Sequence, residues 1–560
     1  MSAGGELAFL ELTEVAELIR GRQVSSVEVT EGILQRIEDF DGRLQSYATV
    51  TGDSALEAAR VADAEMAAGN YRGPLHGIPV AVKDLCFTMD APTAAGGTIR
   101  SDFVPPFDAT VVRRLKEAGA VITGKLRMTE GAYAEHHPAL PTPLNPWGSD
   151  TWVGSSSSGS GVATAAGLCY ASLGSDTGGS IRLPSAQNGV TGIKPTWGRV
   201  SRHGVFELAE SLDHIGPMTR SARDAGVVLS AIAGEDVHDP TAVSVPVPNY
   251  AENLRLDRLP SVGIDWDLTA TFDEPTRTML TGVVRTLESL GWRVYSIELP
   301  DFENASADWE HMCAVETAAA HAGTYPSRAS DYGPALAHLI DTGLGLSAIE
   351  YQALLSRRRA FTGRMKRIFQ DIDLVLLPGA GLASPTTATM SSLGTSPELL
   401  AGLLVPTAPL DISGTPTISL PGGFTERGTP IGFQLCGGDF SEQLLVSAAH
   451  TFQSATDFHE KHPELERTTV AVRPLRFSAR PSVARRPGVC RRARDGGTLV
   501  TCREVGDGNY SQFHPRDESE HVHTTIWAND TSSSPRARRV LRSIRQHRLH
   551  TTGSADGYLF

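Results

Sequence analysis

Segments with helical spacing alternate with short apolar runs along most of this chain, and this alternation limits the possible folds more than any other feature. Helices and strands of that kind bury their apolar faces by packing helices against a sheet. The pattern therefore predicts a layered α/β fold. The predicted helix and strand pairs are 109–119 with 120–123, 159–167 with 170–173, and 279–290 with 292–297. Mostly helical stretches are expected at 13–70 and 310–370, a strand at 78–82, and a region of strands at 371–440, with strands at 374–377, 417–420 and 431–435.

Charge divides the chain into an acidic body and a basic tail. Residues 467–560 carry 17 Arg, no Lys and 8 acidic residues, a balance of +9, while the whole chain has a net charge of −14. Residues 1–466 therefore hold about −23, which argues against a nucleic acid partner for the body. The tail lacks periodicity and is rich in Gly, Pro, Ser and Thr, so we expect a disordered extension rather than a basic arm that binds nucleic acid.

Composition also bears on location. The sequence has no apolar run long enough to cross a membrane, and its first 20 residues are acidic, so neither a membrane span nor a secretory signal is expected. The six cysteines form no C-x-x-C pair and suggest no disulfide framework. These features favour a cytoplasmic protein.

One lysine stands out because lysine is rare here. Only six occur among 560 residues, and Lys83 directly follows the apolar run 78–82. Burial disfavours the ammonium form, so the pKa of a buried lysine can fall well below its usual value of about 10.4, and the neutral amine can then act as a base. A strand-end lysine that reaches water or pairs with Asp84 is the alternative.

Two serine-rich segments suggest nucleophilic chemistry. Residues 154–161 (GSSSSGSG) run directly into a predicted helix, so they form a structured loop rather than a linker, and no G-K-[ST] follows to make a phosphate loop. Residues 174–184 (GSDTGGSIRLP) place paired glycines before Ser180, which suits a serine nucleophile beside backbone N–H groups that hold an oxyanion. A capped turn is the alternative. No G-x-S-x-G or S-x-x-K occurs, which excludes the α/β-hydrolase and β-lactamase patterns.

Together these segments resemble the amidase signature family. GIPVAVKDL is similar to its lysine strand, GSSSSGSGVATAAG to its Gly/Ser block, and GSDTGGSIRLPSA to its nucleophile segment. The likeness continues through 188–234 and 411–453 and covers about residues 8–463. It implies a central mixed β-sheet flanked by helices on both faces, in one catalytic domain at 1–466, with 467–560 as an Arg-rich extension.

The resemblance also implies a role for each matching residue, and it implies no metal and no organic cofactor. Ser180 corresponds to the nucleophile, Ser156 to a relay serine that follows a cis peptide bond, and Lys83 to the base. Asp176 and Arg182 correspond to orienting residues. The backbone N–H groups of the implied oxyanion hole are those of Thr177, Gly178, Gly179 and Ser180.

The chain departs from the family pattern in the serine loop, where Ser155 and Ser158 replace glycines, and before it, at residues 150–153. Substrate contacts are expected from Met128, Tyr133 and His136. Four residues of the predicted helical stretch are interpreted as helix core in preference to pocket wall: Trp309, Met312, Tyr325 and Tyr351.

The predicted function is hydrolysis of the C–N bond of small carboxylic amides, with aryl acylamides and carbamates as close variants, and water as the second reactant. The main alternative is the amidase subunit of a tRNA-dependent amidotransferase; a catalytically inactive binding module is a third hypothesis, which the intact Lys83, Ser156 and Ser180 disfavour. No nucleic acid or membrane partner is expected, and a homodimer is left open.

Overall fold

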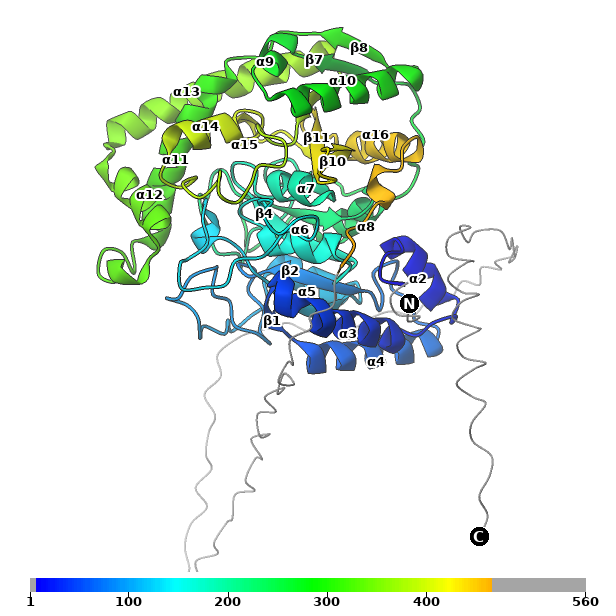
Figure 1. Ribbon diagram of the computed structural model, residues 1–560. Helices are drawn as coiled ribbons and strands as arrows, with labels where there is room; N and C mark the ends of the chain where they lie inside the picture. Colours follow the sequence, from blue (N-terminus) through cyan, green and yellow to red (C-terminus); the bar gives the residue numbers. More distant parts are fainter. Residues whose placement is uncertain (1–6, 466–560) are drawn as a thin grey trace, which may run out of the picture. The chain divides into compact units, whose positions relative to one another are not determined.

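The computed structural model describes residues 7–465 (Figure 1). The predicted extension 467–560 lies outside the described residues. Within the described part, eleven strands form one sheet in the order β1-β3-β2-β4-β6-β5-β10-β11-β9-β7-β8. The strands are β1 (Tyr47–Val50), β2 (Pro79–Lys83), β3 (Val121–Leu126), β4 (Ala171–Asp176), β5 (Thr191–Lys194), β6 (His214–Thr219), β7 (Ser261–Ile264), β8 (Arg293–Ser296), β9 (Leu374–Pro378), β10 (Thr417–Phe424) and β11 (Pro430–Gly437).

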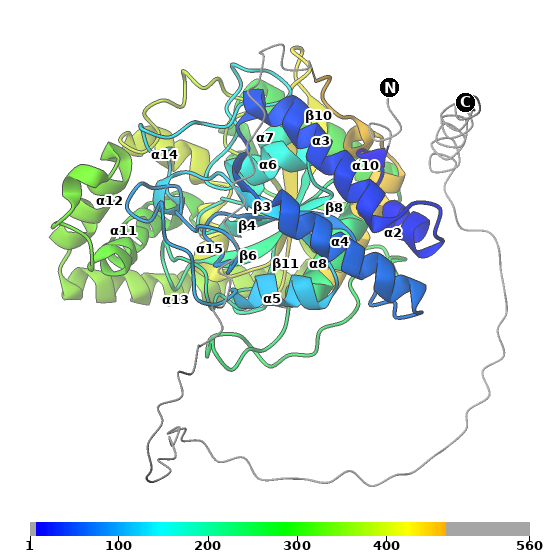
Figure 2. The ribbon, with the colours of Figure 1, turned by 90° about the horizontal axis from the view of Figure 1, so that it is seen from below.

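The sheet is mixed. Parallel pairing joins β3, β2 and β4 toward one edge and β9, β7 and β8 toward the other. The strands between these two groups pair antiparallel, as β1 does with β3. Figure 2 shows α6 and α7 on one side of the strands and α5 and α8 on the other. The mixed sheet with helices on both faces is thus confirmed.

The helices have the following bounds: α2 (Leu12–Arg20), α3 (Ser26–Leu44), α4 (Gly52–Ala67), α5 (Thr110–Glu117), α6 (Ser158–Ala165), α7 (Arg182–Asn188), α8 (Ala222–Ile232), α9 (Trp266–Ala270), α10 (Glu274–Ser289), α11 (Phe302–His321), α12 (Pro334–Gly345), α13 (Ala348–Asp371), α14 (Pro397–Leu404), α15 (Ala408–Ser413) and α16 (Glu442–Ser454), with short 3₁₀ turns η1 (Glu130–Ala132), η2 (Ala329–Asp331) and η3 (Phe458–Glu460). No helix in residues 7–465 combines the length and the apolar character that a membrane crossing needs.

The predicted helix and strand pairs are confirmed as α5 with β3, α6 with β4, and α10 with β8. Two predictions are wrong in part. The stretch 13–70 contains a strand, β1, because the Asp41 carboxylate accepts the N–H groups of Ser46 and Tyr47 and so turns the chain out of α3 and along β3. The region 371–440 contains α14 and α15 as well as strands.

Parallel pairing of β2 with β4 positions the site. The register sets Val80 opposite Ala171 and Val82 opposite Leu173. Two parallel strands end at the same edge of a sheet, so Lys83, the last residue of β2, lies beside the end of β4. The chain leaves β4 through residues 177–181 into α7, and the serine loop enters α6 from residues 154–157. Segments far apart in sequence therefore meet at one edge.

Candidate active site

Lys83 is surrounded by hydroxyl groups. Its Nζ donates to Ser156 Oγ at 2.7 Å, Ser157 Oγ at 2.8 Å and Ser175 Oγ at 2.8 Å. The side chain is fully buried. None of these three partners carries a charge.

Burial lowers the pKa of Lys83 to about 7, although Asp176, Cys86 and Asp213 act in the opposite direction. At neutral pH a large fraction of this amine is therefore unprotonated and can accept a proton. The alternative pairing with Asp84 is wrong, because Asp84 forms its ion pair with Lys125, at 3.4 Å.

The serine loop is a structured segment, as the sequence predicts. The peptide bond between Ser155 and Ser156 is cis. Ser156 O accepts the N–H of Thr129 at 3.2 Å, and the Ser158 hydroxyl is hydrogen-bonded to His136 Nε2 at 3.2 Å. These contacts tie the loop to the segment that follows β3.

Ser180 lies on the turn between β4 and α7 and is partly exposed, whereas Ser156 is buried. The Ser180 carbonyl accepts the N–H of Ser157 at 3.2 Å, which joins the turn to the serine loop. The Ser180 hydroxyl makes no hydrogen bond to any described residue. The structure thus brings Lys83 and Ser156 into direct contact and attaches Ser180 to the same loop through its backbone.

The Asp176 carboxylate shapes the turn around Ser180. It accepts the N–H of Gly179 at 2.7 Å and that of Ile181 at 2.9 Å. Within residues 7–465 the backbone N–H groups of Thr177, Gly178 and Ser180 have no acceptor, while that of Gly179 is occupied. Of the four N–H groups expected in the oxyanion hole, three are thus available as donors, and their role stays a prediction.

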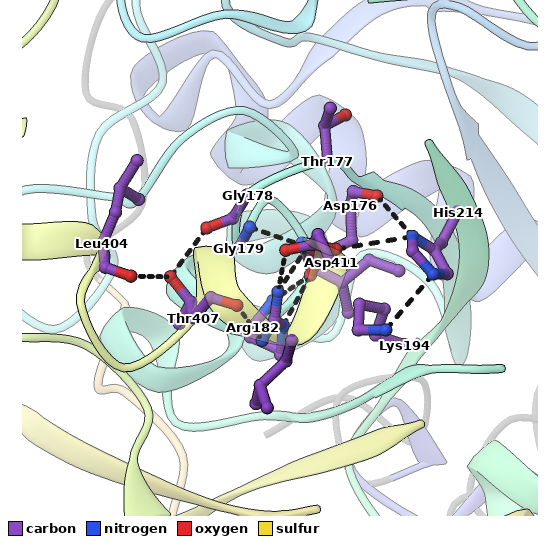
Figure 3. A network of polar contacts seen from close by, with 12 residues as sticks. Asp176, Thr177, Gly178, Gly179, Arg182, Lys194, His214, Leu404, Thr407 and Asp411 are labelled. Carbon is purple, nitrogen blue, oxygen red and sulfur yellow. Dashed lines mark hydrogen bonds and ion pairs between the residues drawn. The ribbon is translucent and has the colours of Figure 1, made fainter. Parts of the chain in front are cut away.

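Arg182 links this turn to α15, more than 200 residues later in the sequence (Figure 3). Its guanidinium bonds Asp176 at 2.8 Å and Asp411 at 2.5 Å, all three side chains being fully buried. Burial alone would raise the pKa of Asp176, but Arg182 and the backbone N–H donors outweigh it and hold that pKa well below its ordinary value. Burial raises the pKa of Asp411. These contacts join the turn to α15, and the orienting role of Asp176 and Arg182 stays a prediction.

Beside Ser180 lies a small cavity. Its described lining contains no Asp, Glu, Lys, Arg or His side chain. The lining residues are Ala132, Tyr133, Ala134, Ser155, Thr177, Gly178, Ser180, Leu183, Leu208, Trp309, Leu393, Leu400, Leu403 and Leu404. Gly179, whose N–H donates to Asp176, does not line the cavity.

Of the three residues expected to contact the substrate, one lines this cavity. Tyr133 lines the cavity, whereas Met128 and His136 lie outside its lining. Met128 is buried in the core, and His136 is held behind the serine loop by Ser158, where burial lowers its pKa to about 4. The core interpretation of Trp309 is wrong in part: this buried residue is also cavity wall.

Sequence reasoning missed several contributors. Ser175 lies inside the nucleophile motif, and its contact with Lys83 in the fold is what indicates a role. Thr407 and Asp411 come from the region 371–440, which is predicted to form strands, and the α14 leucines carry no motif at all. Their contribution arises from packing across more than 200 residues of sequence.

Comparison with known proteins agrees with the resemblance seen in the sequence. The sequence model of the family described as Amidase matches residues 28–446. A protein of Mycobacterium tuberculosis that carries the name amidase AmiD is 60% identical over 454 residues, which span 81% of this chain and 96% of that protein. A glutamyl-tRNA(Gln) amidotransferase subunit of Moorella thermoacetica is 38% identical, and the match covers 82% of this chain and 99% of that protein.

A solved structure gives the same result. The native peptide amidase from Stenotrophomonas maltophilia superposes with a TM-score of 0.71 at 27% identity, covering 81% of this chain and 98% of the other. The family model matches most of the chain, and the relatives are covered almost in full. The chain therefore belongs to the amidase signature family and is a hydrolase that acts on amide C–N bonds.

Proposed function

We propose that this protein hydrolyses small uncharged amides through an acyl-enzyme on Ser180, with Ser156 as proton relay and Lys83 as base. The observation that carries the proposal is Lys83: a fully buried amine, with a pKa near 7, whose side-chain contacts are three neutral hydroxyls. An amine in such surroundings is a base at neutral pH.

In the first half-reaction the unprotonated Lys83 takes the proton of Ser156 Oγ, and Ser156 takes that of Ser180. Ser180 Oγ then bonds to the amide carbon, and the π electrons of the C=O move onto its oxygen. Collapse of this intermediate breaks the C–N bond, and the proton held by Lys83 passes through Ser156 to the departing nitrogen. The products are an amine or ammonia and an ester on Ser180.

In the second half-reaction water replaces the amine. Lys83 and Ser156 accept a proton from the water as its oxygen bonds to the ester carbon. The new intermediate collapses, the bond to Ser180 Oγ breaks, and the relay returns the proton to Ser180. A carboxylic acid leaves and the enzyme is restored.

We assign the stabilisation of both oxyanions to the N–H groups of Thr177, Gly178 and Ser180. Two observations support this set: these N–H groups lack an acceptor among the described residues, and all three residues line the cavity. Gly179, whose N–H already bonds Asp176, is a structural member of the turn.

The cavity supports an uncharged acyl group. Leucines, alanines and two aromatic residues make up most of its wall, and a charged group placed there would lose its hydration without a partner. Aryl acylamides and carbamates are compatible with the same chemistry, because each offers a carbonyl carbon and a nitrogen leaving group.

Because two relatives are named as amidotransferase subunits, the alternative function has to be compared with the lining of the cavity. Free glutamine, the substrate of the glutaminase activity that this alternative predicts, carries both an ammonium and a carboxylate. The described lining of the Ser180 cavity offers no charged side chain to either group. We therefore favour a free-standing amidase.

The proposal extends to the boundaries and the setting of the enzyme. The site residues lie between Lys83 and Asp411, so a chain that ends at residue 466 is expected to keep full activity. Four described cysteines are buried free thiols, which supports a cytoplasmic location. A homodimer stays a prediction.

The decisive experiment uses the purified full chain, a fluorophosphonate label and a panel of primary amides, anilides, carbamates and free glutamine. We expect the label on Ser180, hydrolysis of apolar amides, and loss of both labelling and hydrolysis in Ser180→Ala with an unchanged circular dichroism spectrum. Labelling of another residue, or full activity of Ser180→Ala, would refute the mechanism. Glutaminase activity that needs a partner protein would support the amidotransferase alternative.

A further inference from the structure

The four carbonyl groups of the turn 177–180 are all held by hydrogen-bond donors. Gly179 O accepts the N–H of Leu183 at 2.7 Å, and Ser180 O accepts that of Ser157 at 3.2 Å. The other two carbonyls are held by side chains from distant parts of the chain. Thr177 O accepts Trp309 Nε1–H at 2.6 Å, and Gly178 O accepts Thr407 Oγ1–H at 2.7 Å.

Holding a carbonyl also fixes the next N–H group. A trans peptide unit is planar, with its C=O and N–H on opposite sides. Trp309 therefore fixes the direction of the Gly178 N–H, one of the three without an acceptor in the described chain. Donation to a carbonyl also polarises the peptide unit and strengthens its N–H as a donor.

Thr407 acts on the neighbouring unit. Its hydroxyl holds Gly178 O at one end while Asp176 holds the Gly179 N–H at the other, at 2.7 Å. Thr407 O in turn accepts Arg182 Nη1 at 3.0 Å. The Gly178–Gly179 unit is thus bound on both sides and cannot turn its N–H toward the cavity, which leaves Thr177, Gly178 and Ser180 to present theirs.

We propose that Trp309 and Thr407 are positioning residues: Trp309 holds the peptide unit that presents the Gly178 N–H to the oxyanion, and Thr407 holds the next unit with its Gly179 N–H on Asp176. This inference rests on the proposed function. Neither residue exchanges a proton with the substrate.

Trp309 also limits the shape of the substrate. Its ring lies directly over Gly178, where a Cβ would come within 2.4 Å of it, and it is part of the cavity wall. The residue is 4% exposed, on α11. A single side chain from the second half of the molecule therefore both orients the turn and bounds the space beside Ser180.

The test removes each donor while keeping the shape of the side chain. Thr407→Val removes the hydroxyl, and Thr407→Ser restores it. For Trp309, benzothienylalanine keeps the fused ring and lacks the N–H, and Trp309→Phe is the genetically simple version. The readouts are kcat and KM for butyric 4-nitroanilide, inhibition by 1-butaneboronic acid, whose adduct resembles the tetrahedral intermediate, and the rate at which a fluorophosphonate labels Ser180.

We expect Thr407→Val and the benzothienylalanine variant each to lower kcat about 10-fold, less than the loss of a direct oxyanion donor. KM should change little, and both boronate affinity and labelling rate should fall by a similar factor. Thr407→Ser should recover most of the loss. Tyr351→Phe, which removes a side-chain hydrogen bond to Glu316, is the matched control, and its kcat should stay at the wild-type value.

The inference is overturned if both donor variants keep wild-type kcat and boronate affinity, or if they change only KM or thermal stability. Such a result would leave the proposed function standing, provided that the wild-type protein is still labelled on Ser180. If the nitroanilide is not hydrolysed, the labelling rates alone decide. If Ser180 is not the labelled residue, the proposed function fails and this inference fails with it.

Discussion

Two buried cations lie close to the Ser180 turn, and their surroundings are opposite. Lys83 is in contact with three neutral hydroxyls, and burial lowers its pKa to about 7. Arg182 lies between the carboxylates of Asp176 and Asp411, and these raise its pKa above the ordinary value despite burial. Both side chains are fully buried, so exposure does not distinguish them.

The comparison teaches that the partners of a buried cation decide what it can do. Hydroxyls solvate an amine without stabilising its charge strongly, so the proton of Lys83 is easily lost and regained. Carboxylates keep the guanidinium charged at all working pH values, and its fork of donors fixes two chain segments. The first arrangement suits proton transfer, and the second suits holding a turn in place.

The largest effect is expected from removing the amine itself. Lys83→Ala and Lys83→Arg should both lower kcat about 10²–10⁴-fold, the factor that proton transfer by a positioned base contributes. Arginine should not rescue activity, because its guanidinium stays charged. Steady-state kinetics on the best amide of the panel will measure this loss. Lys83→Arg with a kcat near that of the wild type would remove the distinction between the two cations.

Breaking the other cluster should act on stability. Arg182→Met leaves the Asp176 and Asp411 carboxylates buried without their cation, which is expected to cost about 3–5 kcal/mol. Urea unfolding monitored by fluorescence will measure the change in the free energy of unfolding. The double variant Arg182→Met with Asp176→Asn removes one of the unpaired buried charges and should recover part of the lost stability. If the single variant were as stable as the wild type, Arg182 would not be needed to hold the turn in place.

The pH dependence of activity should report on Lys83. Its ammonium is inactive as a base, so kcat/KM should rise about tenfold per pH unit below pH 7 and level off above it. Ser175→Asp would give Lys83 a carboxylate partner like those of Arg182 and should move the midpoint up by at least about one unit. Ser175→Ala, the matched control, should move it slightly down, because the ammonium loses one acceptor. A midpoint that stays fixed in Ser175→Asp would show that another group titrates.

The smallest effect is expected where the serine loop departs from the family pattern. Ser158→Gly restores the glycine of the pattern and removes the hydrogen bond to His136 Nε2. One neutral hydrogen bond contributes about 0.5–1.5 kcal/mol, so stability should fall by about that amount and kcat should stay within twofold. A double-mutant cycle with His136→Asn will isolate this contact. A large loss of kcat would instead place Ser158 in the proton relay.

Prediction from sequence was most successful where information is local. The apolar run 78–82, the helix beginning near Ser158 and the strand before residue 177 were all recognisable from spacing. The strand β1 was not predicted, because its four residues follow a helix closely. The turn between them depends on hydrogen bonds from Ser46 and Tyr47 to the Asp41 carboxylate. α14 and α15 are short, and their leucines and prolines have no periodicity that separates them from strands.

The sequence by itself determined which chemical groups are present and in what order: a lysine after a buried strand, a serine loop before a helix, and a serine after paired glycines. The tertiary structure alone decided that Lys83 meets Ser175 instead of Asp84, that the Gly179 N–H is occupied, and that Trp309 and Thr407 hold the turn. The physical reason is that a pKa and a hydrogen bond depend on neighbours in space. Here those neighbours are brought together by the register of β2 on β4 and by side chains more than 100 residues away.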